Sequence, residues 1–124
     1  MDPIEAIPHR PPVRCVEEML EATPDHCVAR MRAPDAAEPW LIEGLAQTAA
    51  LLNATAYGET ERGMLVQVRR FDIARPPEAG ELLTTRVEVI IRLAPVHLLR
   101  GEVTDASGAV IASGELKFFV EPNE

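Results

Sequence analysis

The stretch "WLIEGLAQTAALLNATAYG", residues 40–58, decides the fold because it is apolar around almost its whole circumference when drawn as a helix. A helix of this kind is buried in a core rather than laid on a surface. Pro39 suits the first turn and Gly58 suits the stop, so we expect a helix over about 39–56. Glu43 and Gln47 stand one turn apart on the same stripe of it.

The sequence around the helix changes to the alternating, β-branched pattern of strands. Two short runs precede the helix and four runs follow it, at residues 13–23, 26–33, 64–74, 81–93, 96–105 and 109–120. Proline, glycine and aspartate mark the turns between them. The order β-β-α-β-β-β-β predicts an α+β fold, a single domain over residues 1–124. An antiparallel sheet wrapped round the central helix, or a second copy of the chain, would hide both helix faces.

The composition excludes several classes of function. The net charge of −8 argues against binding to nucleic acid or to an anionic membrane. Cys15 and Cys27 form no CxxC motif and are expected to be reduced and buried. No cluster of histidine and cysteine has ligand spacing, so we expect neither a metal nor a redox cofactor. The absence of a signal-peptide pattern and of a long apolar run predicts a cytoplasmic protein.

Four segments together resemble a known family, the hotdog-fold 3-hydroxyacyl-ACP dehydratases. "IPHRPPVRCVEEMLE" (7–21) is similar to the family's opening "LPHRYPFLLVDRVLE", and "IEGLAQTAALL" (42–52) resembles its helix motif "IEAMAQ". "RRFDIARPPEAGELL" (69–83) resembles "ARFRRPVxPGDxL", one residue longer and with Ala79 in place of the proline. "VTDASGAVIASGELKF" (103–118) is similar to the last hairpin. The resemblance runs nearly end to end.

The resemblance implies a hotdog fold and a dimer, with sheets joined edge to edge and the two helices nearby. It also implies a substrate held as a thioester on a phosphopantetheine arm, bound in a tunnel at the subunit interface. In the family a histidine of one subunit and the helix acid of the other carry out dehydration. The helix acid matches Glu43, and the helix amide matches Gln47, which would orient the acid or the substrate.

The chain departs from the family just before the helix. The family has its histidine in a "GHFPGxPxxPG" loop, where this sequence reads "MRAPDAAEPWLIEG" (31–44), a shorter loop without histidine. Dehydration needs a base for the α proton, an acid for the departing hydroxyl and a donor to the enolate oxygen. Glu43 can fill one role only. Asp35 is the acid placed where a replacement base could stand, against the ordinary interpretation of a solvated turn residue.

The three histidines offer weaker replacements. His9, in "PHR", fits a structural role in the N-terminal leader. His26 is expected at a turn, and His97 lies in a strand pattern that fits a packed or surface position.

Glu43 and Gln47 have two interpretations. They could be the exposed stripe of an amphipathic helix, but the stripe does not continue, because Ala50, Leu51 and Ala54 follow. We therefore favour a position in a pocket or an interface, where a buried acid must find partners.

Four further residues are candidates for substrate binding: Trp40, Gly44, Arg70 and Phe71. Trp40 could cap an acyl tunnel or be core. Gly44 could let other backbone approach the helix closely at the site, or it could serve ordinary helix packing. Arg70 precedes Phe71 near the strand that lines the tunnel mouth in members of the resembled family. Arg70 could contact the phosphate of the carrier arm, or it could be a solvated arginine.

The predicted function is the handling of acyl thioesters on acyl carrier protein or coenzyme A, as a divergent dehydratase in fatty-acid or polyketide-type synthesis. The protein would be a homodimer or a higher oligomer. Two alternatives stay open. One is a non-catalytic partner in a heterodimer with a related hotdog subunit, and the other is a thioesterase whose helix acid activates water.

Overall fold

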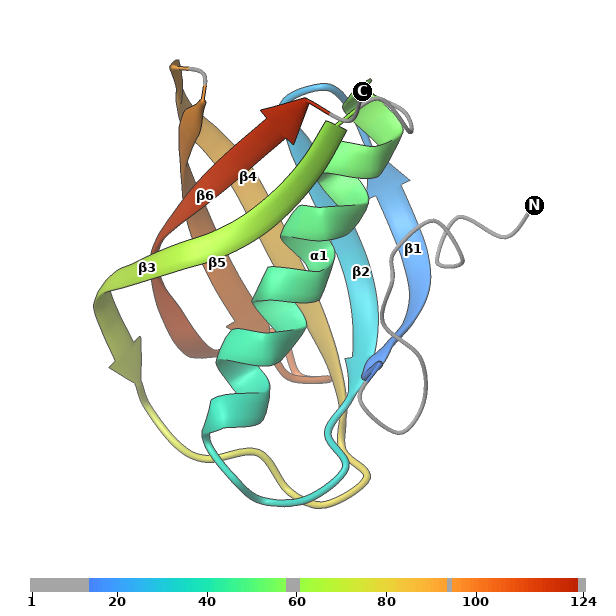
Figure 1. The fold of residues 1–124 in the computed structure, drawn as a ribbon. Helices are drawn as coiled ribbons and strands as arrows, with labels where there is room; N and C mark the ends of the chain where they lie inside the picture. Colours follow the sequence, from blue (N-terminus) through green and yellow to red (C-terminus); the bar gives the residue numbers. More distant parts are fainter. Residues whose placement is uncertain (1–13, 58–60, 94, 123–124) are drawn as a thin grey trace.

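The computed structural model describes residues 14–57, 61–93 and 95–122 (Figure 1). Its elements are β1 (Val16–Ala22), β2 (His26–Arg32), α1 (Pro39–Tyr57), β3 (Glu61–Ile73), β4 (Leu82–Leu93), β5 (Val96–Thr104) and β6 (Val110–Pro122). The predicted order of strands and helix is confirmed. The N-terminal leader with His9, the helix stop at Gly58 and half of the turn at 94–95 lie outside the described residues.

The predicted strand bounds are wrong at several ends. β1 begins three residues later than expected, at Val16, and β3 begins three residues earlier, at Glu61. β6 runs two residues further, to Pro122. The ends of β3 and β6, where Glu61 pairs with Pro122, lack the alternating β-branched pattern that marks the rest of these strands in the sequence.

All six strands form one antiparallel sheet in the order β1-β2-β4-β5-β6-β3. The sheet curves round α1, which lies in its hollow (Figure 1). The predicted architecture, a sheet wrapped around one central helix, is therefore confirmed. β1 and β3 are the two edges of the sheet, although β3 and β4 are neighbours along the chain.

The core lies between the helix and the concave face of the sheet. Leu41, Leu45 and Leu51 of α1 are fully buried. Facing them are side chains that alternate along the strands, as a half-buried sheet requires: Cys27, Ala29, Met31, Leu83, Val87, Leu99, Val103, Leu116 and Phe118. The helix therefore hides its apolar circumference mainly within its own chain.

The helix and the sheet approach closely near the start of α1. A Cβ atom on Gly44 would stand 2.3 Å from Sδ of Met31 in β2. One turn later, the hydroxyls of Thr48 and Thr85 lie 2.6 Å apart, fully buried. Thr48 also donates to the carbonyl of Gly44, and Thr85 lies 3.3 Å from the carbonyl oxygen of Ala29. This small-residue and hydroxyl contact fixes how α1 sits on the sheet.

A charged network ties the β3–β4 connection to the β5–β6 hairpin. The Arg75 guanidinium contacts Glu81 at 2.6 Å and Asp105 at 3.2 Å. The hydrogen bonds from Arg75 lower the pKa of Glu81. Hydrogen bonds from Ser107 first, then from the Ala109 N–H, and also from Arg75, lower the pKa of Asp105 to about 2. Both carboxylates therefore stabilise the fold in their charged form.

Candidate active site on the central helix

Gln47 is the most constrained polar side chain on the described part of α1. It is fully buried. Its Oε1 accepts the backbone N–H of Cys15 at 2.9 Å and of Val16 at 3.1 Å, where the chain enters β1. Its Nε2 donates to Oε1 of Glu43 at 3.0 Å. The exposed-stripe interpretation is therefore wrong for Gln47.

These contacts fix the orientation of the Gln47 amide. Backbone N–H groups can only donate, so the amide oxygen must face Cys15 and Val16. The amide nitrogen is then turned towards Glu43. A 180° flip of the amide would place its N–H groups against the N–H groups of Cys15 and Val16. Oε1 of Glu43 is thereby held as an acceptor.

Glu43 itself is half-buried, one turn before Gln47 on α1. The charge of Glu43 acts on the Cys15 thiol. The Sγ atom of Cys15 lies 3.7 Å from Oε1 of the intervening Gln47. Burial first, and the Glu43 charge second, raise the pKa of Cys15 to about 12. Cys15 is therefore a protonated thiol, as is Cys27, whose pKa burial also raises to about 12. The ionisable group suited to proton transfer here is Glu43.

Asp35 and Trp40 lie on either side of the start of α1. Asp35 is exposed, and its Oδ1 accepts the N–H of Ala37 at 2.8 Å, which is the geometry of an aspartate turn. This contact supports the solvated-turn alternative for Asp35. Trp40 is half-buried and packs against the core cluster.

Gly44 faces the core, where Met31 and Thr85 would meet any added Cβ. That placement supports the packing alternative for this glycine.

The candidates on β3 lie at an irregularity of that strand. Its pairing with β6 shifts register between Arg69 and Asp72. Arg70, inside the bulge, has a positive φ of 49° and is exposed. Phe71 is half-buried, and its ring packs on Gly114, where a Cβ would come within 2.7 Å of Cδ2. The bulge thus separates an exposed guanidinium from an inward-facing ring.

Neither described histidine lies beside Glu43. His26 begins β2, with Nδ1 at 3.0 Å from the Thr23 hydroxyl and Nε2 at 3.3 Å from Glu21. It stands five residues, or about 16 Å of strand, from Met31, the residue that meets Gly44. His97 is buried near the other end of α1, beside Asn53. Asn53 follows Glu43 by ten residues, about 15 Å along the helix axis.

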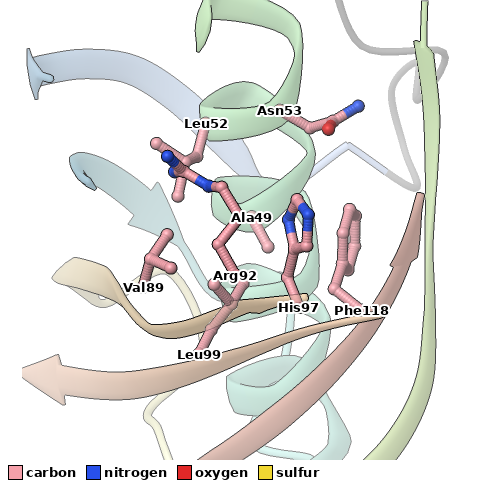
Figure 2. A pocket seen from close by; sticks show the side chains of 8 residues that line it. All are labelled: Ala49, Leu52, Asn53, Val89, Arg92, His97, Leu99 and Phe118. Carbon is pink, nitrogen blue, oxygen red and sulfur yellow. The ribbon is translucent and has the colours of Figure 1, made fainter. Parts of the chain in front are cut away.

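The sequence did not single out the surroundings of His97. Ala49, Leu52, Asn53, Val89, Arg92, His97, Leu99 and Phe118 line a small hollow between α1 and the sheet (Figure 2). A buried strand histidine was one of the two expected positions for His97. The neighbouring Asn53 gave no signal, because a single asparagine on an apolar helix belongs to no motif.

Residues 14–57, 61–93 and 95–122 contain no group of three or more histidine, cysteine or acidic side chains that could hold a metal ion. Over the same ranges, no helix combines the length and apolar character needed to cross a membrane.

Comparison with known proteins finds similarity at the level of structure. The chain matches no protein-family model and no curated protein. It is similar over its whole length to a chain of the dehydratase heterocomplex ApeI:P from Xenorhabdus doucetiae, of which 93% is covered, with a TM-score of 0.82 and 17% identity.

Two other solved structures are similar over most of the chain. A hypothetical thioesterase with coenzyme A from Streptococcus pneumoniae TIGR4 covers 86% of this chain and is itself 87% covered, at a TM-score of 0.72 and 14% identity. The E. coli PaaI protein from the phenylacetic acid degradation operon is similar over 82% of this chain and 80% of its own chain. Its TM-score is 0.68 and its sequence identity is 14%. At these identities the likeness shows the fold alone, and that fold is the hotdog fold.

Proposed function

We propose that this chain is one subunit of an enzyme that dehydrates 3-hydroxyacyl thioesters, and that it contributes the Glu43 carboxylate to the site. The observation that carries the proposal is the fixed amide of Gln47. Its oxygen is held by two backbone N–H groups, so its nitrogen must hold Glu43. A carboxylate positioned in this way is prepared for proton transfer.

Glu43 alone does not complete the chemistry. The reaction also needs a second acid or base and a donor to the enolate oxygen. Neither His26 nor His97 lies near Glu43, and the loop before α1 contains no histidine. We therefore propose that a related hotdog subunit supplies a histidine. The similarity to a chain of a dehydratase heterocomplex is in keeping with this proposal.

The second subunit would join at the β3 edge. β3 has 13 residues and ends the sheet, so its outer row of backbone groups can pair with another strand. On α1 the half-buried residues Ile42, Glu43, Ala46, Ala50 and Ala54 form the more open face. A partner joined at β3 would approach this face and place its own groups near Glu43.

The substrate would be an acyl thioester of acyl carrier protein or of coenzyme A. Trp40 and Phe71, both half-buried, are our candidates for the walls of an acyl tunnel. Arg70, exposed at the β3 bulge, is our candidate for the phosphate of the carrier arm.

The test compares the chain alone with the chain mixed with a hotdog subunit that keeps a "GHFPG" loop, such as one encoded by a neighbouring gene. Enoyl absorbance and free thiol are followed together on a short 3-hydroxyacyl thioester. We expect the mixture to be about 100 to 10,000 times faster than the chain alone, the usual worth of a general base. Glu43→Gln should abolish this gain, whereas Glu88→Gln, an exposed carboxylate on β4, should keep it.

Three results would contradict the proposal. Full dehydration by the chain alone would mean a self-sufficient site. An unchanged rate in Glu43→Gln would remove Glu43 from the chemistry and leave a non-catalytic partner. Release of thiol would make the protein a thioesterase, the second candidate, which is favoured by a positioned carboxylate that can activate water without a histidine.

A further inference from the structure

The hollow beside His97 contains a buried polar atom without a hydrogen-bond partner. Asn53 is 6% exposed, and its Oδ1 is fully buried with no partner among the described residues. A buried amide oxygen in that position costs free energy unless something donates to it. Figure 2 shows the Asn53 side chain extending from α1 above the rings of His97 and Phe118, with its amide oxygen on the side nearer to them.

The size of the hollow limits what can lie there. Its free volume is about 10 Å³. One water molecule needs about 10–15 Å³ on this scale, so the free volume matches that of a single water. Five of its lining residues are apolar, and the polar atoms gather on Asn53, His97 and the rim residue Arg92.

We propose that Asn53 and His97 hold one internal water molecule that bridges α1 to the start of β5. Water donates to the amide oxygen, and it would equally accept from the amide nitrogen if the side chain turned by 180°. The imidazole supplies the second polar contact, which fits the two to four partners typical of buried water. Because Asn53 lies about 15 Å along the helix from Glu43, this site is separate from the candidate active site.

The water would mediate a polar contact between the helix and the sheet. Asn53 lies on the last third of α1, and His97 is the second residue of β5. Near the start of α1 the two layers meet directly through Thr48 and Thr85. Towards its end the polar contact between them would pass through a solvent molecule instead.

The first test is a high-resolution crystal structure of the full chain. We expect one density peak about 2.7–3.2 Å from the Asn53 amide and within hydrogen-bond distance of a His97 ring nitrogen. An empty hollow, a peak too large for water, or an Asn53 amide bonded to a protein group would overturn the proposal.

The second test is NMR in solution. Water cross-peaks to the His97 ring protons should be present in the wild type and in Thr55→Ala, which changes an exposed residue of the same helix. They should be lost in Asn53→Leu, which fills the site with an apolar side chain of similar size. Persistence of the cross-peaks in a folded Asn53→Leu would contradict the proposal. If that variant does not fold, the wild-type crystal structure decides alone.

Discussion

The side chain of Gln47 holds the backbone of Cys15 and Val16 across 31 or 32 positions of sequence. A helix amide thereby takes the place of a strand neighbour at the point where the chain enters the sheet. The same amide holds Glu43. The start of β1 and the candidate catalytic acid are therefore coupled through one side chain.

Replacing Gln47 by alanine should lower the free energy of unfolding by about 2–4 kcal/mol, because two buried backbone N–H groups lose their acceptor. Urea unfolding measures the change. Gln67→Ala is the matched control, since Gln67 is exposed on β3 and such changes stay within about 0.5 kcal/mol. Equal effects in the two variants would show that the Gln47 contacts carry little stability.

Replacing Gly44 by alanine should destabilise the protein although it improves helix propensity. The propensity gain is about 1 kcal/mol, whereas the new Cβ would stand 2.3 Å from Sδ of Met31, and overpacking costs about 1–3 kcal/mol. We expect a net loss of about 1 kcal/mol by thermal or urea unfolding. In a Met31→Ala background the same change should become stabilising. A loss of equal size in both backgrounds would rule out the clash with Met31 as the cause.

The buried hydroxyls of Thr48 and Thr85 should be strongly coupled. Replacing either one by valine leaves the other without its partner at 2.6 Å and should cost about 1–3 kcal/mol. The double variant should cost less than the sum of the two, since the contact between the two hydroxyls can be lost only once. Unfolding free energies of the four proteins give the coupling, and simple additivity would argue against a direct hydrogen bond.

The Arg75 network should make stability sensitive to acid. Because the folded pKa of Asp105 is about 2 and that of Glu81 is also lowered, their contribution is present above the unfolded values near pH 4. It is lost as the pH falls towards 2. Arg75→Gln should lower stability at neutral pH and partly flatten its decline between pH 5 and pH 2. The change should come mainly through Glu81, because Asp105 keeps its hydrogen bonds from Ser107 and Ala109.

Unfolding measured over a series of pH values checks this. Arg86→Gln is the control, because it removes an arginine from an exposed pair with Glu88, which should matter little. An unchanged acid slope in Arg75→Gln would show that the network does not set the pH dependence.

The sequence predicted the architecture because the spacing of its apolar residues distinguishes the helix clearly from the strands. The apolar circumference of residues 40–57 indicated a buried helix, and the alternating runs around it indicated strands able to cover it. The isolated polar pair on that helix also indicated a position unlike a solvated stripe, which the burial of Gln47 supports.

The partners of that pair were beyond prediction. Gln47 is held by the backbone of Cys15 and Val16, and a backbone N–H has no signature in the sequence. The contact depends on where β1 lies against α1, which follows from the curvature of the whole sheet. Asn53 was missed for a related reason, since its burial beside His97 arises only when β5 is set against the end of the helix.

The order of strands has a consequence for the speed of folding. β4, β5 and β6 are successive neighbours in the sheet and can pair as hairpins, with short loops to close. The pairing of Arg32 with Leu82 joins β2 to β4 across roughly 50 residues that include α1 and β3. Closing this long loop has the largest entropic cost among the strand pairings. We therefore expect the hairpins to form first and the pairing of β2 with β4 to limit the folding rate.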